Sequence, residues 1–181
     1  MDKRITLKNL KHAQFASLET HCFNATIYLD GERAFKASNE GSGGPNEYFP
    51  YHGQHEHDFN DHYRFVSDAA VDWVKENDLD FYERVKDDDD GWASLDFVIT
   101  HLINDHLLLK NMRDIMKRKV VFLDRDDSKV YTITEKPTPD KIDYLRRQHP
   151  KWQLFNDIES EDERVALWRR AWTKSKSSTT M

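Results

Sequence analysis

Four histidines lie within residues 52–62, and acidic residues separate them. The histidines are His52, His55, His57 and His62, and the acidic residues are Glu56, Asp58 and Asp61. Imidazole and carboxylate groups are ligands of zinc and manganese, and a metal with an open coordination position can hydrolyse bonds. One alternative for the function is therefore a metal-dependent hydrolase or nuclease. Against it, the sequence has no H-E-x-x-H motif and no outlying motif that completes a site. Histidines near the start of a helix are more often exposed or capping residues.

A glycine-rich segment, Gly41-Ser42-Gly43-Gly44, precedes the histidines. Its backbone N–H groups could approach a phosphate, so binding of a nucleotide signal is a further alternative. However, the segment does not lead directly into a helix, and no lysine follows at the Walker spacing. The candidate binding residues of this region are Asn39, Glu40, Ser42, Gly43, Gly44, Asn46, Tyr48 and His52.

The single cysteine, Cys22, stands beside His21. Adjacent residues of a strand face opposite sides, so His21 is poorly placed to act as a base for Cys22. One cysteine excludes an intrachain disulfide and a polycysteine zinc site. The serines match no nucleophile elbow. The chain therefore offers no complete set for nucleophilic catalysis.

Polar residues also interrupt the apolar pattern of a long predicted helix over residues 92–118. His101 and His106 are turned about 140° apart on an ideal helix, which is poor for two ligands of one metal. We expect His101 to pair with Asp105 and His106 to be a half-buried packing residue. Asn104 and Asp105 need polar partners, so this turn is a place to look for a pocket.

The elements that would position these residues follow from hydrophobic periodicity and turn chemistry. Strands are predicted at 4–9, 23–29 and 33–37, the last two joined by Asp30-Gly31, a strong hairpin signal. A helix is predicted from about residue 58 to 75, a second hairpin over 120–134 and a strand at 152–155. Thr138 and Pro139 open one further helix, and Ser160 with Glu163 forms a capping box for the last.

This order predicts an α+β fold: a mostly antiparallel sheet, made of two hairpins plus added strands, packed by about four helices. Only the strand at 152–155 could pair in parallel. We expect a single domain over residues 1–181, an irregular glycine- and histidine-rich loop at 39–57 and a disordered tail at 174–181.

The composition describes a folded and highly charged protein. The chain has 181 residues, of which 33% are charged and 12% aromatic, with a net charge of −6. There is no global cationic footprint, which argues against direct nucleic-acid binding. An acidic surface favours solubility, which is the simpler interpretation, and could also suit a basic partner, including a nucleic-acid-binding protein inhibited by mimicry of phosphate charge.

Tryptophan and basic residues alternate near the C-terminus, a pattern that can bind single strands by stacking. Trp168 and Trp172 share the helical face of Val165, so packing in a core or interface is the favoured interpretation. No apolar run is long enough to cross a bilayer, and the first residues lack a signal-peptide pattern. We therefore expect no membrane association and a location in the host bacterial cytoplasm.

Several segments resemble an uncharacterised family of short accessory proteins encoded by bacteriophages and mobile elements. They are NLKHAQFASLETHCFNATIYLDG, NEGSGG, INDHLL with KRKVVF, and LFND, and they fall between about residues 9 and 157. The family has no assigned catalytic or binding residues, so none can be carried over. The resemblance implies a phage gene for takeover of the host or evasion of its defences.

Together these observations favour a non-enzymatic protein that binds and inhibits or redirects a host or defence-system protein or nucleoprotein. The predicted surface is acidic, rich in loops and built from residues 39–58. We expect no cofactor, with zinc or manganese as the alternative at the histidines. A homodimer is left open.

Overall fold

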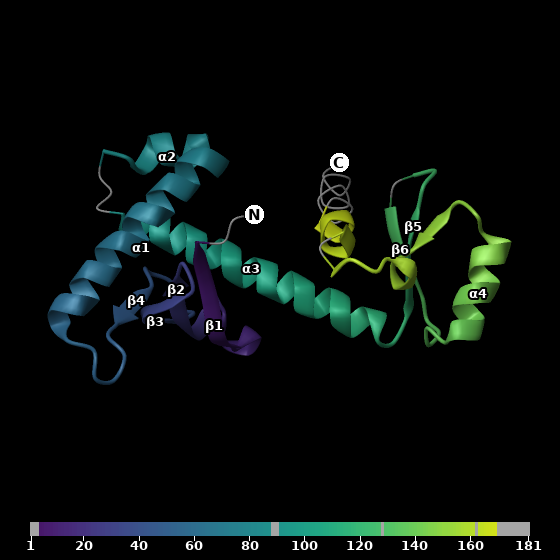
Figure 1. Ribbon diagram of the computed structural model, residues 1–181, viewed down its shortest axis with the longest axis horizontal. Coiled ribbons are helices and arrows are strands. Elements are labelled where there is room, and N and C mark those ends of the chain that lie inside the picture. Colours follow the sequence, from purple (N-terminus) through teal and green to yellow (C-terminus); the bar gives the residue numbers. More distant parts are fainter. Residues whose placement is uncertain (1–3, 88–90, 128, 162, 170–181) are drawn as a thin grey trace. The chain divides into compact units, whose positions relative to one another are not determined.

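A computed structural model describes residues 4–87, 91–127, 129–161 and 163–169. The fold is α+β with antiparallel strands, as predicted (Figure 1). The sequence suggests a single domain, whereas the chain divides into two compact units, Met1–Asp105 and His106–Met181. Each unit has its own sheet and its own buried apolar residues, and those of the second unit form two hydrophobic clusters. Among the described residues, no helix is long and apolar enough to cross a membrane.

The first unit is built on a four-stranded sheet in the order β1-β2-β3-β4. The strands are β1 (Ile5–His12), β2 (Cys22–Leu29), β3 (Glu32–Glu40) and β4 (Glu47–Phe49). The hairpin of β2 and β3 is confirmed, and its two turn residues have φ of 50° at Asp30 and 88° at Gly31. This left-handed pair is what a two-residue hairpin turn requires.

Strand β1 lies at the edge of this sheet and is irregular. Its pairing with β2 shifts register between Lys8 and Lys11, and Asn9 between them has φ of 54°. Such a bulge bends the strand and leaves part of its ladder unpaired. A short 3-10 helix, Gln14–Ala16, then begins the loop that leads to β2.

The segment 39–57 is not wholly irregular, which corrects the prediction. Asn39 and Glu40 end β3, and β4 pairs with it through Lys36 opposite Phe49 and Ser38 opposite Glu47. Gly41, Gly43 and Gly44 lie in the tight connection between these two strands, and Gly53 follows β4. Strand β4 has only three residues and is flanked by glycines and prolines. So short a segment has almost no hydrophobic periodicity, so the sequence pattern does not predict it.

Three helices complete the first unit: α1 (Glu56–Asn77), α2 (Leu79–Val85) and the beginning of α3 (Trp92–Met116). Helix α2 was not predicted; Asp78 initiates it by accepting a hydrogen bond from Phe81 N at 3.0 Å. Helix α1 packs against the sheet (Figure 1), and the Phe35 ring, which is 0% exposed, meets the rings of Tyr48, Phe59 and Tyr63.

The second unit holds a three-stranded sheet in the order β6-β5-β7. Its elements are β5 (Val120–Asp124), β6 (Lys129–Ile133), α4 (Pro139–Gln148), β7 (Trp152–Leu154) and a 3-10 helix, Phe155–Asp157. Strand β7 pairs antiparallel with β5, so the parallel pairing considered from the sequence is wrong. After α4, the chain returns along the free edge of β5 in the opposite direction.

Alternate residues of β5 enter two separate hydrophobic clusters. Val121 and Leu123 pack in one, and Val120 and Phe122 pack in the other, as the two-residue period of a strand demands. Thr138 caps α4 with Pro139 in its first position, and Ser160 Oγ accepts from Glu163 N at 3.3 Å, both as predicted.

The last described helical residues are 163–169. Trp168 among them is 4% exposed, which agrees with the predicted packing role, while Trp172 and the tail at 174–181 lie outside the described residues.

Candidate functional site

The loop between β1 and β2 is fastened to the glycine segment by its backbone. Gly41 O accepts hydrogen bonds from the N–H groups of Leu18 at 2.9 Å and Glu19 at 3.0 Å. A Cβ atom on Gly41 would lie 2.2 Å from Ala16 O, and its φ is +88°. Only glycine can occupy this position without displacing the backbone. The glycine segment is therefore a packed support for the β1–β2 loop.

Asn39 organises both loops from a buried position. Its side chain is 6% exposed, and its Oδ1 accepts from Thr20 Oγ1 and from Gly41 N, each at 2.8 Å. Its Nδ2 lies 3.2–3.3 Å from three oxygen atoms of residues 44–46. One amide thus satisfies polar groups on two connections at once, which buried polar groups require.

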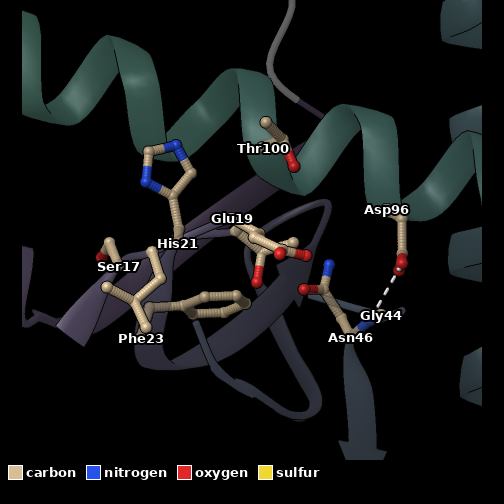
Figure 2. Close-up of a pocket in the computed structure, with 10 residues that line it drawn as sticks. Ser17, Glu19, His21, Phe23, Gly44, Asn46, Asp96 and Thr100 are labelled. Atoms are coloured by element: carbon tan, nitrogen blue, oxygen red, sulfur yellow. Dashed lines mark hydrogen bonds between the residues drawn. The ribbon is translucent and has the colours of Figure 1, made fainter. Parts of the chain in front are cut away.

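Helix α3 joins this network through Asp96. Asp96 Oδ2 accepts from Asn46 N at 2.9 Å (Figure 2), and its Oδ1 accepts from the hydroxyl of Tyr48. Burial raises the pKa of Tyr48 above its ordinary range, and the negative charge of Asp96 raises it further. Tyr48 is consequently a protonated donor that ties β4 to the helix.

Two histidines connect the β1–β2 loop to a later turn of α3. His12 Nε2 lies 3.1 Å from His21 Nδ1, and His21 Nε2 lies 3.1 Å from Asn104 Oδ1. The sequence predicts a polar partner for Asn104, and His21 supplies it across 83 positions of the chain. His101 approaches Asp105 at 3.7 Å as predicted, whereas His106 is exposed rather than half-buried.

Ser17 lies beside this pair, but its geometry does not form a catalytic relay. Ser17 Oγ lies 3.3 Å from His12 Nε2, the same nitrogen that faces His21. A Ser-His relay needs the two ring nitrogens to serve different partners. Ser17 Oγ also donates to Ala13 O and accepts from Cys22 N, each at 2.9 Å. The arrangement holds the loop.

A cleft of about 370 Å³ opens between this loop and α3. Figure 2 shows Glu19 and His21 on the loop side of the cleft and Thr100 and Asp96 on the helix side, with the Asp96 carboxylate directed toward Asn46. Among the described residues that line it, the lysine, arginine, aspartate and glutamate side chains are those of Glu19 and Asp96, and both are acidic. The Glu19 carboxylate has no hydrogen bond or ion pair to any residue within the described part of the chain.

The β1–β2 loop carries two exposed apolar side chains. Phe15 is 91% exposed and Leu18 is 81% exposed, the two highest values among the large apolar residues of the described chain that are exposed. Leu18 also lines the cleft, together with Phe23. Large apolar side chains held in water by a fastened loop are typical of recognition surfaces.

The candidate binding residues read from the sequence divide into three groups. Gly44 and Asn46 line the cleft. Asn39, Gly43 and Tyr48 support it from within, and Gly43 N does so by donating to Thr20 Oγ1 at 3.3 Å. Glu40, Ser42 and His52 are exposed and do not line the cleft.

Sequence reasoning missed the exposed Phe15 of the loop and four residues that line the cleft, namely Leu18, Glu19, His21 and Asp96. The available signal was two apolar residues, Phe15 and Leu18, in a polar connection between strands.

The four histidines proposed as metal ligands take separate roles. His52 and His55 are exposed, and His55 is the N-cap residue of α1. His57 Nδ1 lies 3.5 Å from Asp61 Oδ2, while His62 Nδ1 lies 3.0 Å from Gln54 Nε2. Across the described ranges, no three histidine, cysteine or acidic residues form a group that could hold a metal ion. The zinc or manganese alternative stays a prediction without a ligand set in this part of the chain.

Two backbone N–H groups of the glycine segment are used within the protein. Gly41 N and Gly43 N donate to Asn39 and Thr20 inside the protein. The acidic lining of the neighbouring cleft would repel a phosphate. Binding of a nucleotide signal at this segment stays a prediction.

No family model, curated protein or solved structure matches this chain.

Proposed function

We propose that this is a non-enzymatic binding protein that inhibits or redirects a host or defence-system component, as a phage accessory protein would. The observation that carries the proposal is the β1–β2 loop, which exposes Phe15 by 91% and Leu18 by 81% while its backbone is fastened to Gly41. The phage context is an inference from the sequence resemblance.

The loop has the physical properties of a binding element. Burying one large apolar side chain against a partner contributes on the order of 1.5–3 kcal/mol. Because Gly41 O holds the N–H groups of Leu18 and Glu19, little backbone freedom remains to be lost on binding. A preorganised apolar pair next to a cleft therefore fits the centre of a protein interface.

The charge of the first unit suggests what kind of protein would bind. Residues 1–105 hold 21 aspartates and glutamates against 10 lysines and arginines, a formal charge of −11. A basic partner would approach such a surface faster, and wrong acidic partners would be repelled. This supports a basic host or defence protein, or the basic protein of a nucleoprotein.

The test is affinity capture with the full-length chain and matched surface variants. Lysate of the bacterial host is passed over wild type, Phe15→Asp with Leu18→Asp, and Leu79→Asp. Leu79 is 57% exposed on α2, so its variant controls for loss of an exposed apolar residue elsewhere. We expect a basic protein that wild type and the control retain and the double variant loses. Equal retention by all three, or retention of nothing by wild type, would contradict the proposal.

Self-association through the same loop is measured separately. Light scattering of wild type and the double variant shows whether a homodimer exists and whether Phe15 and Leu18 hold it.

A further inference from the structure

We infer that the cleft beside the β1–β2 loop receives a cationic side chain, foremost an arginine, from the partner protein. The inference rests on the proposed function, because it names what that partner must place next to Phe15 and Leu18. It adds a second contact of different chemistry to the apolar one.

Charge is the first step. The two ionised groups that line the cleft, Glu19 from the loop and Asp96 from α3, have the same negative sign. Asp96 already accepts from Asn46 N and Tyr48, so its charge is stabilised in the folded protein. The Glu19 carboxylate has no such partner among the described residues, and it lies against Gly43, where a Cβ would approach its Oε2 to 2.6 Å. A cation that entered the cleft would supply the missing neutralisation.

Shape and polarity are the second step. Leu18 and Phe23 give the cleft an apolar side, and a long basic side chain packs its methylene stem on such a surface. Thr100 and Ser17 add hydroxyl groups. Acceptors that come from both the loop and the helix (Figure 2) suit the planar five-donor fork of a guanidinium better than a single ammonium.

The position of the cleft is the third step, and it selects a protein side chain over a free small cation. Leu18 belongs at once to the exposed pair and to the lining of the cleft. A partner that covers Phe15 and Leu18 therefore lies at the mouth of the cleft.

The experiment uses the ¹⁵N-labelled full-length chain and two synthetic peptides. One is acetyl-Leu-Arg-Leu-amide, and the other replaces arginine by citrulline, which keeps the shape and removes the charge. We expect the arginine peptide to shift the amide signals of Leu18, Glu19, Gly44 and Asn46, and the citrulline peptide to leave them in place. Shifts by both peptides alike, or by neither, would overturn the inference.

Variants sharpen the result. Glu19→Gln should weaken the arginine peptide about two- to fivefold, the range of an exposed ion pair, and it breaks no hydrogen bond with the described residues. Glu40→Gln is the matched control, because Glu40 is exposed nearby and does not line the cleft. An equal loss in both variants would show a diffuse charge effect and overturn the assignment to the cleft.

A third ligand separates the protein side chain from a soluble cation. Spermidine that shifted the same signals as strongly as the arginine peptide would overturn the assignment to a partner side chain. Failure of this inference can be distinguished from failure of the proposed function. If capture from lysate depends on Phe15 and Leu18 but the arginine peptide gives no response, the proposed binding function stands and only the arginine inference fails.

Discussion

Buried polar groups hold two loops of the first unit in place, whereas stacked rings and exposed ion pairs join elements of the second unit. Asn39 and the backbone of Gly41 fix two loops of the first unit. In the second, the Trp152 ring lies 3.8 Å from that of Phe122 and 3.7 Å from that of His149. The pair of Arg146 with Asp157 and that of Arg113 with Glu161 lie at the surface.

The difference extends to charge. Residues 106–181 hold 17 lysines and arginines against 12 acidic residues, a formal charge of +5 against −11 in the first unit. Buried polar networks specify one geometry because an unmatched group is costly. Exposed ion pairs specify little, because water and salt replace them readily. The first unit, which contains the cleft, is thus the one whose loops are fixed in a single geometry by buried hydrogen bonds.

The largest effect should come from Gly41→Ala. The new Cβ would meet Ala16 O at 2.2 Å in a left-handed backbone, so we expect a loss of about 4 kcal/mol or more in the free energy of unfolding. Urea unfolding followed by amide signals of residues 4–87 measures it. Gly31→Ala is the control, because its φ is also +88° but nothing lies within 4 Å; it should cost about 1–2 kcal/mol. Equal costs would mean that packing at Gly41 is unimportant.

Next comes Asn39→Ala, which leaves the Thr20 hydroxyl and Gly41 N without their buried acceptor. We expect a loss of about 3 kcal/mol. Asn24→Ala, at an exposed position of β2, should stay within about 0.5 kcal/mol. Chemical denaturation of both variants at neutral pH makes the comparison. A loss below about 1 kcal/mol for Asn39→Ala would show that the network contributes little.

Tyr48→Phe should cost about 2 kcal/mol at pH 8, because a hydrogen bond to a charged acceptor is lost. Its pH dependence is distinctive. The folded state raises the pKa of Tyr48 above its ordinary value of about 10. The stabilisation is therefore complete below pH 10 and declines above it, since only the unfolded chain ionises there.

We expect the advantage of wild type over Tyr48→Phe to fall by about 1.4 kcal/mol between pH 8 and pH 11. Urea unfolding at both pH values tests this. An advantage that grew with pH would refute the assigned protonated donor.

The smallest effect should come from the second unit. Arg113→Gln removes an ion pair with Glu161 whose side chains are 53% and 46% exposed. We expect a loss of about 0.2–1 kcal/mol, which shrinks further in high salt. Thermal unfolding at two salt concentrations provides the measurement. A loss of unfolding free energy as large as that of Asn39→Ala would show that the surface ion pairs of the second unit stabilise it as much as the buried network stabilises the first.

Local chemistry explains which elements could be predicted. Asp30-Gly31 and Thr138-Pro139 act on neighbouring backbone only, so the hairpin and the start of α4 follow directly from the sequence. Strand β4 depends on pairing with β3 across the glycine segment, and the direction of β7 depends on the edge of β5 that it reaches. Neither is encoded in a short window.

The candidate site was only partly predictable for the same reason. Gly44 and Asn46 were found because glycine and asparagine mark an irregular segment. The contacts of His21 with Asn104 and of Tyr48 with Asp96 join residues 83 and 48 positions apart. The position of Asn104 on an apolar helix predicts that it has a polar partner, but only the fold shows that this partner is His21.

The bulge of β1 has a consequence for how this protein behaves among its own copies. A strand from another molecule that tried to extend the sheet along this edge would lose its ladder near Asn9, where the backbone turns left-handed. Lys8 and Lys11 add charge on both sides of that point. The β1 edge therefore resists edge-to-edge pairing of the kind that seeds fibrils. Association with other proteins then depends on specific side-chain contacts.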